Sequence, residues 1–442
     1  MRKIKISPSM FIFLSFFLVI IVGALLLWLP FSTKAGENGL NFVDALFTAT
    51  SCVCVTGLTV VSNVGATMSI YGKIVMGILI EIGGLSFLTL AAFFVIIMGK
   101  KMGINARYLL RDNLNQNNIK DAFKIIRLVV LSALVIQTTG AILTFIALSI
   151  GYSDDYSLIE KIGISLFHSA SSFNNAGFDI FGLDTSMAKF HSDVFMNIVT
   201  MLLIIFGGLG TIVLVDLFEL RKNKKLRLHS KIVLITSLSL ITFGTLFFYI
   251  DGRNNDISFL ESLFLSISTR TAGFSTFDLN KLDNSSLVVT CLLMFIGASP
   301  NSTGGGIKTT TVFIIIASLI SFIRGKETEA FRRKISKEAV EKAIMLVILA
   351  AISISVSITL LALSEKNLSL TQIIFEVFSA FATVGLSLGI TPTLTILGRL
   401  VIIFTMFIGR VGLLSIVNIL NTRGDYEYKG SYQYIEEKVL IG

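Results

Sequence analysis

Four short glycine-centred turns are the residues best suited to chemistry in this sequence. Each has a glycine after a small or β-branched residue and before Leu or Phe. The four triplets are Val55-Thr56-Gly57, Asn175-Ala176-Gly177, Thr271-Ala272-Gly273 and Thr383-Val384-Gly385. An extended strand can aim successive carbonyl oxygens at one axis only if one residue takes dihedrals that suit glycine. Four such strands would form rings of carbonyl oxygens that replace the water shell of a cation.

Other site chemistry finds little support in the sequence. The three cysteines, Cys52, Cys54 and Cys291, stand in apolar segments or in segments next to the glycine turns, and they offer neither a disulfide framework nor a zinc ligand set. The three histidines are scattered, and no pair of facing acids lies in the apolar runs, because Glu81 and Asp216 stand far apart. We therefore expect a protein that is not an enzyme.

The elements that must position the turns are short amphipathic segments directly before them. These segments are Phe42–Val53, Glu160–Phe173, Ser258–Thr269 and Leu370–Phe381. A helix of that length covers only about 20 Å at about 1.5 Å per residue, so it cannot cross a bilayer. It can enter the membrane from the outside and return to the same side through an extended stretch. Such a re-entrant segment must be buried in protein or line a water-filled space. Its C-terminal end carries about half a negative charge, which favours a cation beside the turn.

The composition places these segments in a membrane. The chain has 442 residues, of which 53% are hydrophobic and 15% charged, and its mean hydropathy is +0.82. Soluble domains carry about 25% charged residues. Several apolar runs reach the length of about 20 residues that a spanning helix needs. We interpret the first of them, residues 10–29, as a retained transmembrane helix and not as a cleaved signal sequence.

An internal repeat organises the chain. An apolar helix, a short segment, a glycine turn and a second apolar helix follow one another four times, and each second helix carries a further glycine. We predict an all-α integral membrane fold with four M1–pore-helix–M2 repeats: eight transmembrane helices and four re-entrant pore helices in pseudo-fourfold symmetry around one pore. The predicted boundaries are 1–107, 108–225, 226–335 and 336–422, followed by a cytoplasmic tail at 423–442.

The charge distribution predicts the topology. The net charge is +9, and Lys and Arg gather at the N-terminus, in three loops and in the tail, while the other loops are acidic. This alternation is typical of positive-inside topology. It places both termini in the cytoplasm of a multi-pass plasma-membrane protein. Topology explains the basic residues, so we expect no nucleic-acid partner.

The second helix of the third repeat is interrupted. Pro300 and the run Gly304-Gly305-Gly306 break the helix near the predicted midplane. A nucleotide-binding loop is excluded, because Ile307 separates Gly306 from Lys308 and no strand precedes. We predict a flexible gate below the turns, with Lys308 or the backbone obstructing ion passage, and a gate or barrier role for the intramembrane Arg410. In the first two repeats the second glycines are read as close helix crossings.

The four triplets resemble the filter loops of the Trk/Ktr/HKT superfamily of potassium transporters. The resemblance covers nearly the whole chain and is greatest to Ktr-type membrane subunits. It implies filter glycines at Gly57, Gly177, Gly273 and Gly385, and an intramembrane gating loop at Gly304–Lys308. Some relatives that prefer Na⁺ have serine in the first loop, so Gly57 favours K⁺ as the transported ion. The resemblance also implies a homodimer on a cytosolic ring of nucleotide-binding regulatory subunits.

The sequence is also compatible with other functions. The same fold could pass Na⁺, or both ions, and a different class would be an intramembrane enzyme or a structural protein. The cytoplasmic loops are short and the tail after Thr422 has about 20 residues, so no nucleotide is expected on this chain. The basic loops and the tail Arg423–Gly442 would dock a regulatory ring or contact membrane lipid.

Overall fold

Apolar sequence of helical length dominates the chain, and a computed structural model shows helices throughout. The structure describes residues 8–34, 39–61, 63–85, 89, 119–182, 186–223, 225–413, 415 and 417. The predicted tail at 423–442 and most of the first predicted cytoplasmic loop lie outside these residues.

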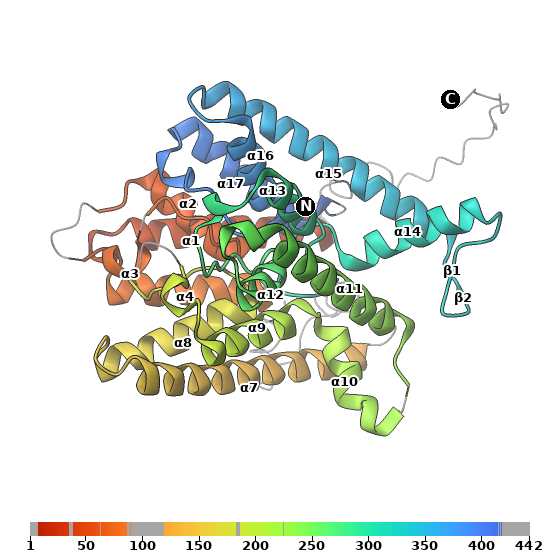
Figure 1. Ribbon diagram of the computed structural model, residues 1–442, viewed down its shortest axis with the longest axis horizontal. Helices are drawn as coiled ribbons and strands as arrows, with labels where there is room; N and C mark the ends of the chain where they lie inside the picture. The colour runs from red at the N-terminus through yellow and green to blue at the C-terminus, as the bar shows by residue number, and fades with distance from the viewer. Residues whose placement is uncertain are drawn as a thin grey trace, which may run out of the picture.

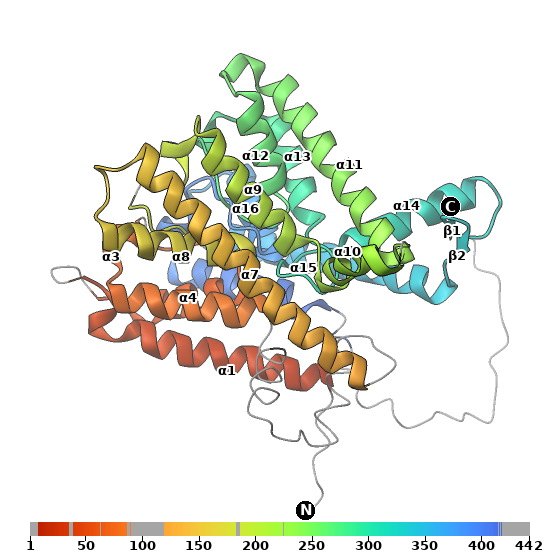
Figure 2. The same cartoon turned by 90° about the horizontal axis from the view of Figure 1, so that it is seen from below.

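Each of the four long helices lies at an edge of the fold in one of two perpendicular views (Figures 1 and 2). They are α1 (Pro8–Trp28), α7 (Ile119–Gly151), α11 (Leu228–Asp251) and α15 (Lys337–Ser364). Each has the length and composition to cross a membrane. Large apolar side chains such as Leu18, Val135, Leu238 and Leu363 are more than half exposed on them. Because soluble proteins rarely expose such surfaces, these faces are suited to lipid.

A shorter, largely buried helix follows each long one. The short helices are α2 (Phe42–Cys54), α8 (Leu158–Asn174), α12 (Phe259–Ser268) and α16 (Leu370–Ala382). Each begins at a side-chain cap: Asn41, Ser157, Ser258 or Ser369 accepts a hydrogen bond from a backbone N–H three residues on. The last three complete a capping box with Glu160, Glu261 or Gln372. The observed bounds differ from the predicted ones by one or two residues.

A third helix then packs against the short helix of the next unit. These helices are α4 (Ile70–Leu85), α9 (Val194–Gly208), α13 (Asn284–Phe295) and α17 (Ile396–Val411). Helix α4 contacts α8, α9 contacts α12, α13 contacts α16, and α17 contacts α2. An ion pair between Arg399 and Asp44 joins the last unit to the first. The packing order is therefore closed, and Figure 2 shows α7, α8 and α9 side by side within one unit.

Two of the third helices are broken. Helix α9 continues as α10 (Thr211–Asn223) after a bend of 103°, where Gly210 takes a φ of 86°. Helix α13 continues as α14 (Thr309–Ile323) after the α13–α14 segment, residues 296–308. By length and composition, the described helices therefore include four spans, or five if α9 and α10 count as one. The predicted number of eight spans stays a prediction.

The remaining elements are small. They are α3 (Val64–Thr67), the 3₁₀ turns η1 (Pro30–Ser32), η2 (Ala188–Phe190), η3 (Gly252–Asn255), η4 (Leu279–Lys281) and η5 (Thr391–Thr393), and the strands β1 (Glu329–Ala330) and β2 (Arg333–Lys334). This hairpin of two short strands is a minor addition to the all-helical fold that the sequence predicted. It forms because Phe331 and Arg332 both take positive φ, at 51° and 62°, which is the two-residue turn that suits the twist of a hairpin.

Candidate cation site

The four glycine turns meet in one place. We call residues 55–57, 175–177, 271–273 and 383–385 the four glycine loops. A Cβ atom added at Gly57 would lie 2.6 Å from the Ala176 carbonyl oxygen, and one at Gly177 would lie 2.6 Å from that of Ala272. An added Cβ at Gly273 would overlap the Val384 carbonyl oxygen, and one at Gly385 would overlap that of Thr56. Each glycine therefore faces the next loop, and the fourth faces the first.

Glycine is required at these positions for two reasons. The φ angles are 95° at Gly57, 69° at Gly177, 74° at Gly273 and 96° at Gly385, a region that side chains disfavour. In addition, the space that a Cβ would occupy already contains backbone of the neighbouring loop. The close approach and the positive φ angle therefore both exclude residues with a side chain at these four positions. The four loops form a narrow ring of backbone.

The third loop is built differently from the others. In the other three loops the residue two before the glycine is left-handed: Val55, Asn175 and Thr383 have φ between 52° and 58°. In the third loop Thr271 has no positive φ, because α12 ends in a tighter right-handed turn at Thr269.

A serine in the last turn of each short helix binds its own loop. The Oγ atoms of Ser51 and Ser379 accept from the N–H of Gly57 and Gly385, at 3.1 and 3.0 Å. Ser171 Oγ donates to the Phe178 carbonyl oxygen at 2.6 Å, and Ser268 Oγ donates to that of Phe274 at 2.5 Å. Sequence reasoning missed these residues. A serine recurring five or six positions before each glycine could have revealed them.

The second glycines of the repeats bring the helices close to the loops. An added Cβ at Gly83, Gly207 or Gly409 would overlap the carbonyl oxygen of Val53, Phe173 or Phe381, each four residues before a loop glycine. In the third unit, Gly297 instead faces the carbonyl oxygen of Gly305. The α13–α14 segment thus occupies the position where the helix end lies in the other three units.

The α13–α14 segment contacts three glycine loops. The side-chain amide of Asn175 is oriented so that both its oxygen and its nitrogen have hydrogen-bond partners. In this orientation Asn175 Oδ1 accepts a hydrogen bond from the Thr303 hydroxyl at 2.9 Å. Gly304 packs on the Thr271 side chain, and the Gly305 N–H donates to Thr383 Oγ1 at 3.0 Å. These contacts place residues 303–305 directly beside the ring.

The same segment is hydrogen-bonded to the bend between α9 and α10. The N–H groups of Ser299 and Thr303 donate to the carbonyl oxygens of Gly208 and Gly207, at 3.1 and 3.4 Å, and the Thr211 N–H donates to Asn301 at 3.0 Å. The bend and the segment therefore form one backbone-bonded unit.

Two cations lie at the segment. Lys308 Nζ donates to the carbonyl oxygens of Gly304 and Gly305, at 2.7 and 3.3 Å, so it stabilises the turn of its own loop. Arg410 donates to the carbonyl oxygens of Thr303 and Gly83. It therefore connects the segment to α4 through backbone oxygens, with no carboxylate partner among the described residues.

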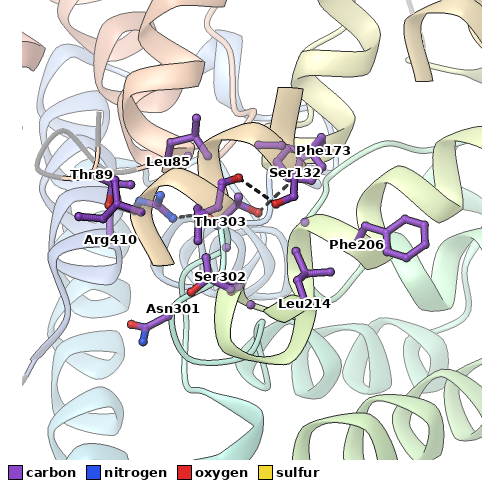
Figure 3. A pocket seen from close by; sticks show the side chains of 18 of the residues that line it. Leu85, Thr89, Ser132, Phe173, Phe206, Leu214, Asn301, Ser302, Thr303 and Arg410 are labelled. Carbon is purple, nitrogen blue, oxygen red and sulfur yellow. Dashed lines mark hydrogen bonds between the residues drawn. The ribbon is translucent and has the colours of Figure 1, made fainter. Parts of the chain in front are cut away.

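A cavity of about 280 Å³ lies on this side of the loops. Its lining includes Phe16 of α1, Ser132 of α7, Leu214 of α10, Thr303 and Arg410. Figure 3 shows Arg410 on one side, Phe206 and Leu214 on the other, and Thr303 between them. The segment contributes Asn301, Ser302, Thr303, Gly304 and Lys308 to the lining of this cavity.

A second cavity, of about 400 Å³, is lined by all four loop glycines together with Asp179 and Asp278. No Lys or Arg is among its described lining residues. Burial raises the pKa of Asp179 to about 6, although hydrogen bonds from Ser186 and the Phe181 N–H act to lower it. Its carboxylate is charged above that pH, so the cavity presents negative charge to a cation.

Two further buried charges lie behind the loops and were given no role in the sequence analysis. Arg270 is 8% exposed and its only described hydrogen bond, at 3.3 Å, goes to Ser237 Oγ. Glu376 is fully buried on α16 and accepts from the hydroxyls of Ser387, at 2.7 Å, and Thr391. Glu376 could have been found from the sequence, because it is an acidic residue within a short, otherwise apolar helical segment.

Side-chain metal chemistry has no candidate in the described part of the chain. No group of three or more His, Cys, Asp or Glu residues is placed to hold a metal ion there. Cys52, Cys54 and Cys291 are free thiols. Backbone carbonyl oxygens of Thr56, Ala176, Ala272 and Val384 lie at the ring, each facing a loop glycine.

The sequence matches the family model of TrkH, cation transport protein, over residues 12–250 and 228–422. It is 39% identical to the potassium/sodium uptake protein NtpJ of Enterococcus hirae, over 99% of this chain and 98% of that protein. It is 38% identical to the Ktr system potassium uptake protein D of Bacillus subtilis, with the same two shares covered.

The structure is also similar to a solved one. It matches the crystal structure of the potassium transporter TrkH from Vibrio parahaemolyticus with a TM-score of 0.72 and 18% identity, over 95% of this chain and 86% of that one. The fold and the family matches agree, and the family consists of transporters, not enzymes. The chain is therefore a membrane protein of the TrkH cation transport family.

Proposed function

We propose that this protein takes up K⁺ through a selectivity filter made of its four glycine loops. The observation that carries the proposal is the closed ring in which each loop glycine faces the carbonyl of the next loop. Carbonyl oxygens at such a ring can replace the water shell of a K⁺ ion. The ends of four short helices add partial negative charge nearby. The filter residues are those of the four triplets that end at Gly57, Gly177, Gly273 and Gly385.

The α13–α14 segment acts as the gate. Its residues 303–305 contact three of the four loops, and Arg410 bonds it to α4. While these contacts hold, Gly304, Gly305 and Gly306 stand between the ring and the inner cavity. Lys308 keeps the loop folded by bonding its carbonyl oxygens, and movement of the segment opens the path.

The architecture that we propose has four M1–pore-helix–M2 repeats around a single pore. It is supported by the closed packing order α4–α8, α9–α12, α13–α16 and α17–α2. Eight spans in the plasma membrane, with both termini in the cytoplasm, agree with the alternation of basic and acidic loops. The outer cavity lined by Asp179 and Asp278 then faces the exterior and attracts cations.

The proposed assembly is a homodimer regulated by a separate cytosolic ring that binds nucleotides. The similarity to proteins named as parts of a Ktr system supports the presence of a further component. The basic loops are the surfaces of this chain that would dock such a ring.

Growth of an uptake-deficient bacterium at limiting K⁺, with and without this gene, tests the proposal. Rescue of growth is expected for the natural sequence. Gly177→Asp and Gly273→Asp should abolish the rescue while the protein still inserts. Unchanged Rb⁺ flux in both variants would refute a filter at these loops.

A pore of the same fold that carries Na⁺, or both ions, is the second candidate. It is favoured by one observation: the relative from Enterococcus hirae is a potassium/sodium uptake protein. Competition between Na⁺ and Rb⁺ in proteoliposome uptake separates the two. Inhibition by Na⁺ at concentrations similar to those of K⁺ would favour the second.

A further inference from the structure

A groove between α11 and α14 stands apart from the ion path. It has a volume of about 480 Å³, and most of its wall is apolar. The apolar wall consists of Ile235 and Leu240 of α11, Ile296, and Val312, Phe313, Ile316, Ala317 and Ile320 of α14. Both helices expose apolar side chains next to it, such as Leu238 at 67% and Leu319 at 58%. The groove therefore opens within a surface suited to hydrocarbon.

The length of the groove fits a fatty acyl chain. It follows α14 from Val312 to Arg324, which is about 18 Å at about 1.5 Å per residue. Half of a hydrocarbon core measures about 15 Å. A chain lying along α14 from the surface to Ile296 would therefore reach the middle of the bilayer.

The end of the groove is basic. Arg324 and Lys326 line it there, together with Glu329 of β1. Both basic side chains are exposed, and no described ion pair involves either of them, whereas the nearby Lys334 is paired with Glu327. Two unpaired cations at the mouth of an apolar groove complement an anionic headgroup on an acyl chain. Glu329 can accept a hydrogen bond from a headgroup hydroxyl.

We propose that this groove binds an anionic phospholipid of the inner leaflet, with its phosphate at Arg324 and Lys326 and an acyl chain between α11 and α14. The proposal rests on the proposed orientation, which places residues 324–342 at the cytoplasmic face, and not on ion permeation. Charge complementarity favours this occupant, because two unpaired cations stand at the end of an apolar groove of acyl-chain length.

The inner end of the groove meets the gate. Ile296 lines the groove and pairs with Ile307 in a short β-bridge, with the Ile307 N–H donating to Phe295 at 3.2 Å. An acyl chain against Ile296 therefore packs on the residue that anchors the end of the α13–α14 segment. Lipid in the groove stabilises that anchor.

Native mass spectrometry of the purified full chain, titrated with phosphatidylglycerol or phosphatidylcholine, tests the proposal. Arg324→Gln/Lys326→Gln should weaken retention of phosphatidylglycerol by about fivefold for each base removed. The matched control Arg332→Gln/Arg333→Gln removes two bases of the adjacent hairpin that do not line the groove and should retain the lipid like the natural chain.

A second pair of variants tests the apolar part. Ala317→Trp fills the groove and should lose phosphatidylglycerol, whereas Leu319→Trp, on the same helix but outside the lining, should keep it. Equal retention in all variants, or equal retention of phosphatidylcholine, would overturn the proposal. It would also be overturned if Ala317→Trp changed the oligomeric mass and left lipid retention intact, because the groove would then belong to a second copy. None of these readings requires ion flux.

Discussion

Arg410 of α17 donates hydrogen bonds to the carbonyl oxygens of Thr303 and Gly83. One guanidinium thus holds the α13–α14 segment against a helix from the other end of the chain. A planar group with several fixed donors can bind two acceptors at once. The closed position of the proposed gate depends on this pair of contacts.

Replacing Arg410 with Met should raise ion flux in the absence of any regulatory partner. Hydrogen bonds to a charged group contribute about 1.5–3 kcal/mol each, and 1.4 kcal/mol is a tenfold change, so we expect an increase of at least about tenfold. The measurement is Rb⁺ influx into proteoliposomes. Arg333→Met is the control, because Arg333 is exposed on the β1–β2 hairpin.

Deleting Thr303–Gly306 should increase flux in the same assay, since these residues contact three of the loops. A deletion that gives folded protein of lower conductance would count against the gate.

Gly177→Ala should abolish K⁺ uptake although it adds only a methyl group. The added Cβ would lie 2.6 Å from the Ala272 carbonyl oxygen, and the φ of 69° disfavours any side chain. Gly163→Ala, on the preceding helix, is the matched control, because nothing lies within 4 Å of its added Cβ. Uptake at limiting K⁺ is measured for both, normalised to inserted protein. Wild-type uptake by Gly177→Ala would contradict the packing of the ring.

Ser171→Ala should reduce the discrimination between K⁺ and Na⁺. Its hydroxyl donates to the Phe178 carbonyl oxygen at 2.6 Å, and a neutral hydrogen bond contributes about 1 kcal/mol, or roughly a fivefold effect. Ser165→Ala is the control on the same helix, because Ser165 Oγ is buried and has no hydrogen-bond partner in the described part of the chain. Competition of Na⁺ with Rb⁺ influx measures the ratio. The idea fails if both alanine variants discriminate alike.

Acidification of the outer side should weaken uptake at low K⁺ as the pH falls through about 6. The pKa of Asp179 is raised to about 6, mainly by burial, so the carboxylate is charged at pH 7.5 and largely protonated at pH 5.5. Protonation removes the negative charge of Asp179, which weakens its attraction for a nearby cation by about 1 kcal/mol in water-like surroundings. The apparent affinity for K⁺ should therefore fall roughly fivefold. Asp179→Asn should remove this pH response, and Asp278→Asn should keep it.

Much of the fold could be predicted from the sequence because its signals are local. Short apolar segments before glycine turns predicted α2, α8, α12 and α16 to within two residues. Proline and consecutive glycines predicted the break after α13. The meeting of the four glycine loops could also be predicted, because four re-entrant helices were expected to direct their C-terminal ends toward one pore.

Other features depend on packing between distant segments and could not be predicted. The 103° bend after Gly208 has no proline. It forms where Thr211 and Gly208 exchange hydrogen bonds with the α13–α14 segment, about 90 residues away. The tighter end of α12 likewise has no sequence signal. The contact of Arg410 with backbone oxygens, and not with an acid, is visible only in three dimensions.

A filter at the four loops requires that they bind a dehydrated ion between them. Crystals grown with Tl⁺ in place of K⁺ test it most directly, through the anomalous signal of Tl⁺. We expect a peak on the axis among the carbonyl oxygens of Thr56, Ala176, Ala272 and Val384. A peak confined to side-chain carboxylates, or an empty ring in protein that conducts Tl⁺, would contradict it.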